Sequence, residues 1–117
     1  MNHQSVNDVL GLQALPDSLS IGQAQTLPEL LAIRVRTTPE GEAYREFDER
    51  ANHWKSLTWA DTAARIARWS RALCASSLPQ CLLFVILLPN GFDAISIDQA
   101  CLRCGYVPVP LHAIDNA

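Results

Sequence analysis

The sequence predicts an α/β fold: a partial domain in which a β-hairpin precedes a βαβ unit of parallel sheet flanked by helices. Three observations lead to this prediction. First, two short extended segments flank a polar loop. Second, an apolar run ends at Pro89 and is followed by a helical pattern. Third, another extended segment follows that pattern after Gly105. Strand, helix and strand in that order form a βαβ unit, whose strands are expected to run parallel with a right-handed crossover.

The first helix is expected to begin at Thr26. Thr26 and Glu29 have the spacing of a capping box, in which the threonine hydroxyl accepts a hydrogen bond from the Glu29 amide. Pro28 fits the first turn, where its missing N–H is not needed. Pro39 ends the helix, because the residue before a proline is pushed away from helical angles. The apolar residues expected on its buried face are Leu27, Leu30, Leu31 and Ile33 or Val35.

The next segments predict a hairpin followed by a second helix. Strands are expected at 43–47 and 55–58, joined by a polar loop. Thr58 and Asp61 again have capping-box spacing, which places the start of the helix there. Asp61 and Arg65 are four residues apart and are spaced to pair, for about 0.3 kcal/mol. Residues at spacings of three and four define one buried face: Trp59, Thr62, Ile66, Trp69 and Leu73.

The C-terminal third is poor in charge. Residues 1–73 hold 17 of the 21 charged side chains, and residues 74–117 hold four. The apolar run over 82–88 is typical of a strand that is covered on both faces, usually in a parallel sheet. A helix over 92–104 is apolar around most of its circumference and ends at Gly105. These features predict a piece of something larger or a tight oligomer, since soluble monomers rarely expose so large an apolar patch.

Composition excludes several classes. With 49% hydrophobic residues and a net charge of −3, the chain is neither disordered nor a general nucleic-acid binder. The longest apolar run has eight residues, far short of the roughly 20 that a transmembrane segment needs. The N-terminus lacks the pattern of a secretory signal, so a cytoplasmic location is expected, with the four cysteines as thiols. Residues 1–25 are interpreted as a poorly structured leader.

From Thr26 onward the chain resembles the N-terminal end of the AMP-forming acyl-adenylating synthetases and ligases, the AMP-binding enzyme superfamily, and within it the long-chain fatty acid–CoA ligases. Four segments occur in the family's order: Leu27–Leu31 with Thr38-Pro39, Ser56–Asp61, Val85–Gly91 and Ala100–Leu111. The resemblance covers residues 26–117, roughly the first fifth of a typical family member. Pro79–Leu83 departs from the family, which carries Gly-Asp and a basic residue before the apolar strand.

The resemblance implies a parent ligase that activates a fatty acid with ATP and Mg²⁺ and transfers the acyl group to coenzyme A. The family's phosphate loop, Thr-Glu metal motif, ribose-binding Asp and catalytic Lys have no counterpart in this sequence. No catalytic, cofactor-binding or metal residue is therefore assigned, and this piece alone is expected to be inactive. Its partner would be the remainder of the parent chain. The alternative is a stand-alone α/β homodimeric interaction module without catalysis.

Cys101 and Cys104 form a CxxC motif. Redox motifs of this kind lie at a helix N-terminus, where the dipole lowers a thiol pKa, whereas this one falls at the end of an expected helix. A zinc site needs two further ligands, and Cys74, Cys81 and His112 match no standard spacing. Structural packing is therefore favoured over redox chemistry or metal binding.

Overall fold

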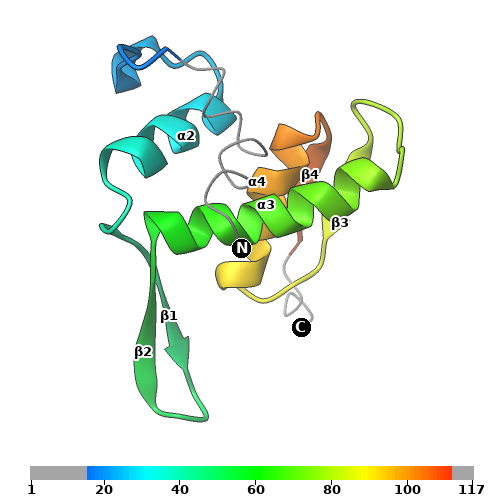
Figure 1. Cartoon of the computed structure of the whole chain (residues 1–117). Helices are drawn as coiled ribbons and strands as arrows, with labels where there is room; N and C mark the ends of the chain where they lie inside the picture. Colours follow the sequence, from blue (N-terminus) through cyan, green and yellow to red (C-terminus); the bar gives the residue numbers. More distant parts are fainter. Residues whose placement is uncertain (1–15, 112–117) are drawn as a thin grey trace.

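Two small sheets and three α-helices make up residues 16–111, the part of the chain that the computed structural model describes (Figure 1). The predicted α/β class is confirmed. The elements are a 3-10 helix η2 (Ile21–Gln23), α2 (Leu27–Thr37), β1 (Glu42–Asp48), β2 (His53–Thr58), α3 (Trp59–Ala75), β3 (Leu83–Ile86), α4 (Phe92–Arg103) and β4 (Val107–Pro110). Figure 1 shows the β1–β2 hairpin projecting from the start of α3, away from β3 and β4.

The predicted hairpin is confirmed. β1 pairs with β2 in antiparallel orientation, and Phe47 lies opposite Trp54 with ring centroids 5.3 Å apart. Lys55 and Asp48 form a cross-strand ion pair. β2 begins earlier than expected and β1 runs one residue further, because regular pairing continues to the His53 and Asp48 positions. β1 also begins earlier, at Glu42, which pairs with Thr58 beyond a register shift.

Helix α2 begins as predicted but exposes part of its expected core face. Thr26 Oγ1 accepts from the Glu29 amide at 3.3 Å, while the Glu29 carboxylate accepts from the Gln25 amide, so only half of the capping box forms. Leu27 is 57% exposed and Leu30 37% exposed, so their predicted burial was wrong. These two side chains border an open hollow, while the core lies on the side of Leu31, Ile33 and Val35.

Helix α3 begins with a complete capping box. Thr58 Oγ1 accepts from the Asp61 amide at 3.0 Å, and the Asp61 carboxylate accepts from the Thr58 amide at 3.1 Å. The Asp61 carboxylate therefore accepts hydrogen bonds from Thr58 at the start of the helix. Arg65 pairs instead with Asp93 of α4 at 3.1 Å, so the predicted Asp61–Arg65 pair was wrong.

The buried face of α3 is centred on small side chains. Ala63 and Ala67 are at most 1% exposed and Ser70 is 2% exposed, whereas Trp69 is 38% exposed. Burial of Trp69 was therefore predicted wrongly, because the close approach of α4 selects the side of α3 where the side chains are small. Of the other residues expected on that face, Trp59 is half-buried, and Thr62, Ile66 and Leu73 are buried.

The predicted βαβ unit is confirmed. β3 and β4 pair in parallel, with Leu83 opposite Val107 and Ile86 opposite Pro110, and α4 lies between them in the chain. Gly105 adopts a φ of 77°, which allows the helix to end there at no steric cost. One face of this sheet, carrying Ile86, packs into the core that α3 and α4 share.

The predicted leader falls largely outside the described residues. Its described part, residues 16–25, includes η2, which contacts α2. Arg36 donates hydrogen bonds to the carbonyl oxygens of Pro16 at 3.1 Å and Leu19 at 3.0 Å. These bonds hold residues 16–19 against the end of α2.

The N-terminus of α4 is capped by a residue that is distant in sequence. Gly91 stands at the N-cap position and has no side chain with which to accept. The Glu46 carboxylate from β1 accepts from the Phe92 amide at 3.1 Å, and a Cβ on Gly91 would lie 3.0 Å from that carboxylate. A negative charge at this position satisfies an unpaired amide and complements the helix dipole. The hairpin is thereby joined to the βαβ unit.

Replacing Glu46 with alanine should lower the free energy of unfolding by about 1–2 kcal/mol, because a helix cap is lost. Urea-induced unfolding followed by circular dichroism measures the loss. The matched control is Glu49→Ala, since Glu49 is an exposed carboxylate in the turn of the same hairpin. Equal losses in both variants would contradict a capping role for Glu46.

Candidate functional site

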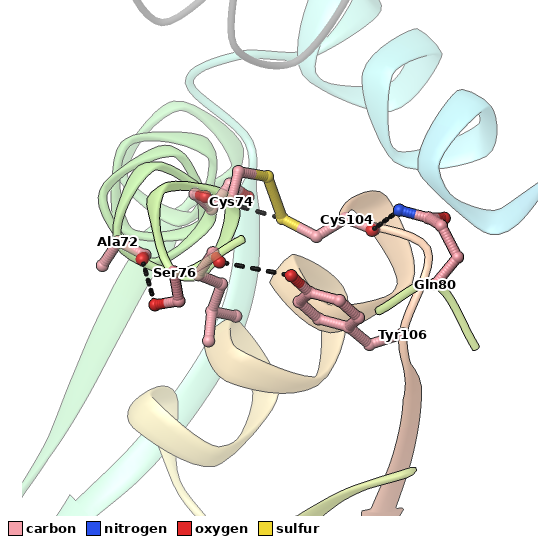
Figure 2. The surroundings of a disulfide bond; sticks show 8 residues. Ala72, Cys74, Ser76, Gln80, Cys104 and Tyr106 are labelled. Carbon is pink, nitrogen blue, oxygen red and sulfur yellow. Dashed lines mark hydrogen bonds between the residues drawn. A yellow bond between two sulfur atoms is a disulfide. The ribbon is translucent and has the colours of Figure 1, made fainter. Parts of the chain in front are cut away.

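A disulfide between Cys74 and Cys104 joins the C-terminal ends of α3 and α4 (Figure 2). Their Cα atoms are 5.9 Å apart, a spacing that disulfides commonly bridge. The expectation that all four cysteines are thiols was therefore wrong for this pair, because helix packing brings together two residues 30 positions apart. Cys81 and Cys101 are free thiols.

The CxxC motif does not close on itself. Cys104 bonds to Cys74, while Cys101 is 0% exposed within the core. Burial, and after it the nearby charge of Asp98, raises the pKa of the Cys101 thiol to about 11. Cys101 therefore has the packing role that the sequence favoured, whereas Cys104 is a covalent cross-link. Among residues 16–111, no group of three or more His, Cys, Asp or Glu side chains could hold a metal ion, and His112 lies outside those residues.

Hydrogen bonds on both sides support the disulfide (Figure 2). Tyr106, at the start of β4, donates its hydroxyl to the carbonyl oxygen of Leu73 at 3.3 Å. Gln80, in the loop before β3, donates its amide to the carbonyl oxygen of Cys104 at 3.2 Å. The cross-link therefore lies in a framework built from α3, the following loop and the start of β4.

A hollow of about 290 Å³ lies beside the disulfide and is lined by Ser70, Arg71, Cys74 and Arg103. We call it the disulfide hollow. Cys74 is exposed, and the two arginines carry positive charge at neutral pH. The Ser70 hydroxyl is buried and makes no hydrogen bond to any described residue. The exposed cysteine of the disulfide, two cations and an unsatisfied hydroxyl thus line one hollow.

A second hollow, of about 330 Å³, lies against α2. It is lined by Ile21, Leu27, Leu30, Leu31, Arg34, Tyr44, Trp59 and Gln99. The Arg34 guanidinium stands 5.7 Å from the centroid of the Trp59 ring, and Tyr44 packs on the same ring at 5.9 Å. No pattern in the sequence indicates this hollow, because its lining comes from η2, α2, β1, α3 and α4.

The β3–β4 sheet leaves an apolar face uncovered. Exposure is 67% for Leu83, 56% for Val85, 61% for Leu87 and 43% for Val107. We call these four residues the open sheet face. Their neighbours Phe84 and Ile86 are turned toward the core cluster. The sequence predicted cover on both faces of this strand, and the described residues supply it on one.

The disulfide, the two hollows and the open sheet face lie in a chain of the α/β class. No family model matches it. Over 100 residues, 85% of this chain, it is 27% identical to an uncharacterized protein of Schizosaccharomyces pombe. The match covers 7% of that relative's length, so the chain spans a small fraction of the protein it resembles. Within residues 16–111, no helix is both long and apolar enough to cross a membrane.

The raised pKa of Cys101 predicts a loss of stability at alkaline pH. Below about pH 9 the thiol is protonated in both the folded and the unfolded chain. Between about pH 9 and pH 11 the unfolded chain ionises while the folded chain does not, so the free energy of unfolding falls. Urea unfolding at a series of pH values measures this slope. Cys101→Ala should show a shallower slope, and an identical slope would refute the assignment.

Ser70→Ala should raise the free energy of unfolding by about 1 kcal/mol, because it removes a buried hydroxyl without breaking a hydrogen bond. The control is Ser96→Ala. Ser96 is also buried, but its hydroxyl donates to the carbonyl oxygen of Phe92 at 2.6 Å, so its removal should be destabilising. Thermal unfolding of both variants tests whether the two substitutions change the free energy of unfolding in opposite directions. Destabilisation by Ser70→Ala would show that its hydroxyl is satisfied.

Proposed function

We propose that this chain is the N-terminal structural part of an AMP-forming acyl-adenylating enzyme of the fatty acid–CoA ligase type. The four segments that resemble the family fall in the regions of α2, the β2–α3 junction, the end of β3 with its following turn, and the end of α4 with β4. Their order along the chain is the order that the resemblance implies. The proposal concerns the parent protein, to which this chain contributes structure.

The observation that supports the proposal best is the open sheet face. Parallel sheets occur almost only with both faces covered, because helices pack on each side. Here Leu83, Val85, Leu87 and Val107 are between 43% and 67% exposed. Further elements of a larger α/β domain would cover them. The similarity to 7% of a much longer relative is in keeping with such a setting.

No step of the reaction is assigned to this chain. The sequence has no phosphate loop, and residues 16–111 contain no group of three or more His, Cys, Asp or Glu side chains placed to hold a metal ion. ATP, Mg²⁺, coenzyme A and the fatty acid would therefore be bound by other parts of the parent protein, which we place in the cytoplasm. The role of this chain would be to supply two parallel strands and the helices that cover one side of them.

A second candidate is a stand-alone module that forms a homodimer. The same open sheet face favours it, since two copies packed face to face would bury these apolar side chains. Burial of such area is favourable by roughly 25 cal/mol for each Å² removed from water. The two proposals differ in what covers the face: another part of the same polypeptide or a second copy.

The isolated chain should show no fatty-acid-dependent exchange between ATP and pyrophosphate, whereas the product of the whole reading frame should show it. In that whole protein, Val85→Glu should abolish the exchange by placing a charge under the covering elements. Leu78→Glu is the matched control, because Leu78 is exposed in the loop before β3. Absence of exchange in the whole protein with a range of fatty acids would overturn the ligase proposal.

Sedimentation of the isolated chain tests the second candidate. A dimer that Val85→Glu dissociates, together with a whole protein that forms no adenylate, would establish the interaction module. A monomer at all concentrations would exclude it.

A further inference from the structure

We propose that the Cys74–Cys104 disulfide is a thiol–disulfide exchange site for a small thiol that carries carboxylates, such as glutathione, bound in the disulfide hollow. The proposal is independent of the ligase assignment. It rests on the exposure of Cys74, the charge of the hollow and the unsatisfied hydroxyl that lines it.

The two ends of the disulfide differ in accessibility. Cys74 is exposed at the end of α3, whereas Cys104 is 8% exposed and belongs to the core cluster. Figure 2 shows the bond running from the end of α3 toward Cys104. Thiol–disulfide exchange depends on which sulfur the incoming thiolate can reach. An attacking thiolate therefore reaches Cys74 Sγ and expels Cys104 Sγ.

The hollow fits an anionic thiol. Arg71 of α3 and Arg103 of α4 line it beside Cys74, and guanidinium groups bind carboxylates through charge-assisted hydrogen bonds. Ser70 also lines the hollow; it is 2% exposed, and its hydroxyl lacks a partner among the described residues. A thiol without carboxylates presents only the charge of its own thiolate to the two cations. The hollow therefore favours thiols with carboxylates over neutral ones.

The exchange is a two-step reaction. A thiolate RS⁻ attacks Cys74 Sγ, the Cys74–Cys104 bond breaks, and the electron pair leaves on Cys104 Sγ, which takes a proton from solvent. The products are a mixed disulfide on Cys74 and a Cys104 thiol. Cys104 Sγ lies 3.5 Å from the carbonyl oxygen of Ser70, which can accept a hydrogen bond from the new thiol. A second RS⁻ releases RSSR and leaves Cys74 as a thiolate, so Cys74 and Cys104 are reduced and the small thiol is oxidised.

The free cysteines do not compete in the first step. Cys101 is 0% exposed, so it is shielded from solvent and from small reagents. Cys81 is exposed, and its amide donates to the carbonyl oxygen of Gly105 at 2.8 Å. As a thiol it can react with the RSSR that the second step produces. Cys81→Ser is therefore used as the background for the test.

The experiment compares two thiols on the whole chain in that background. Reduced glutathione and 2-mercaptoethanol are added at equal thiolate concentrations, the reaction is quenched with acid, and mixed disulfides are mapped by mass spectrometry of peptides. Glutathione should appear on Cys74. The ratio of the glutathione rate to the mercaptoethanol rate should fall about tenfold in the Arg71→Gln/Arg103→Gln double variant, because charge attraction is lost.

Two controls separate this effect from a general loss of structure. Arg68→Gln removes an exposed cation of α3 that does not line the hollow, and it should leave the ratio unchanged. In the chain that keeps all its arginines, rising salt should lower the same ratio, because screening weakens attraction to carboxylates. This second measurement needs no arginine variant to fold.

Three results would overturn the proposal. The first is glutathione attached to Cys104, or to no cysteine of the folded chain. The second is a rate ratio that neither the double variant nor salt changes. The third is an equal fall of the ratio in Arg68→Gln, which would show attraction by the overall charge of α3.

Discussion

The close contact between α3 and α4 determines where the other elements lie. Ala63 and Ala67 on α3, and Ala100 and Cys101 on α4, are each at most 1% exposed. Small side chains let two helices approach closely, and interiors packed at this density leave few alternative arrangements. The same contact brings the ends of the two helices to disulfide distance, and Ile86 of β3 packs into the core that the two helices share.

The contact also separates four cysteines into three chemical environments. Cys101 is enclosed between the helices and stays protonated, Cys74 and Cys104 are joined at the rim, and Cys81 remains exposed in the loop before β3. Exposure and local charge, more than sequence spacing, determine thiol reactivity. The CxxC spacing is therefore a poor guide here, and the covalent pair crosses from one helix to the other.

The open sheet face lies in the last third of the chain, where charged residues are few, so its exposed side chains are apolar. β3 alternates between a core-facing side at Phe84 and Ile86 and an exposed side at Leu83 and Val85. An exposed parallel strand with apolar residues is a pairing and aggregation hazard unless something covers it. The ligase and homodimer proposals each supply such cover, from the same polypeptide or from a second copy.

The sequence alone determined the local structure: the start of α3 at its capping box, the end of α4 at Gly105, the hairpin and the order of the βαβ unit. These features depend on hydrogen bonds within a few residues and on backbone angles that Pro and Gly restrict. Only the tertiary structure decided which apolar residues are buried, which cation Asp93 pairs with, that Glu46 caps α4, and that Cys74 bonds to Cys104. Each of these depends on the angle and closeness of two elements distant in sequence, which periodicity within one element does not specify.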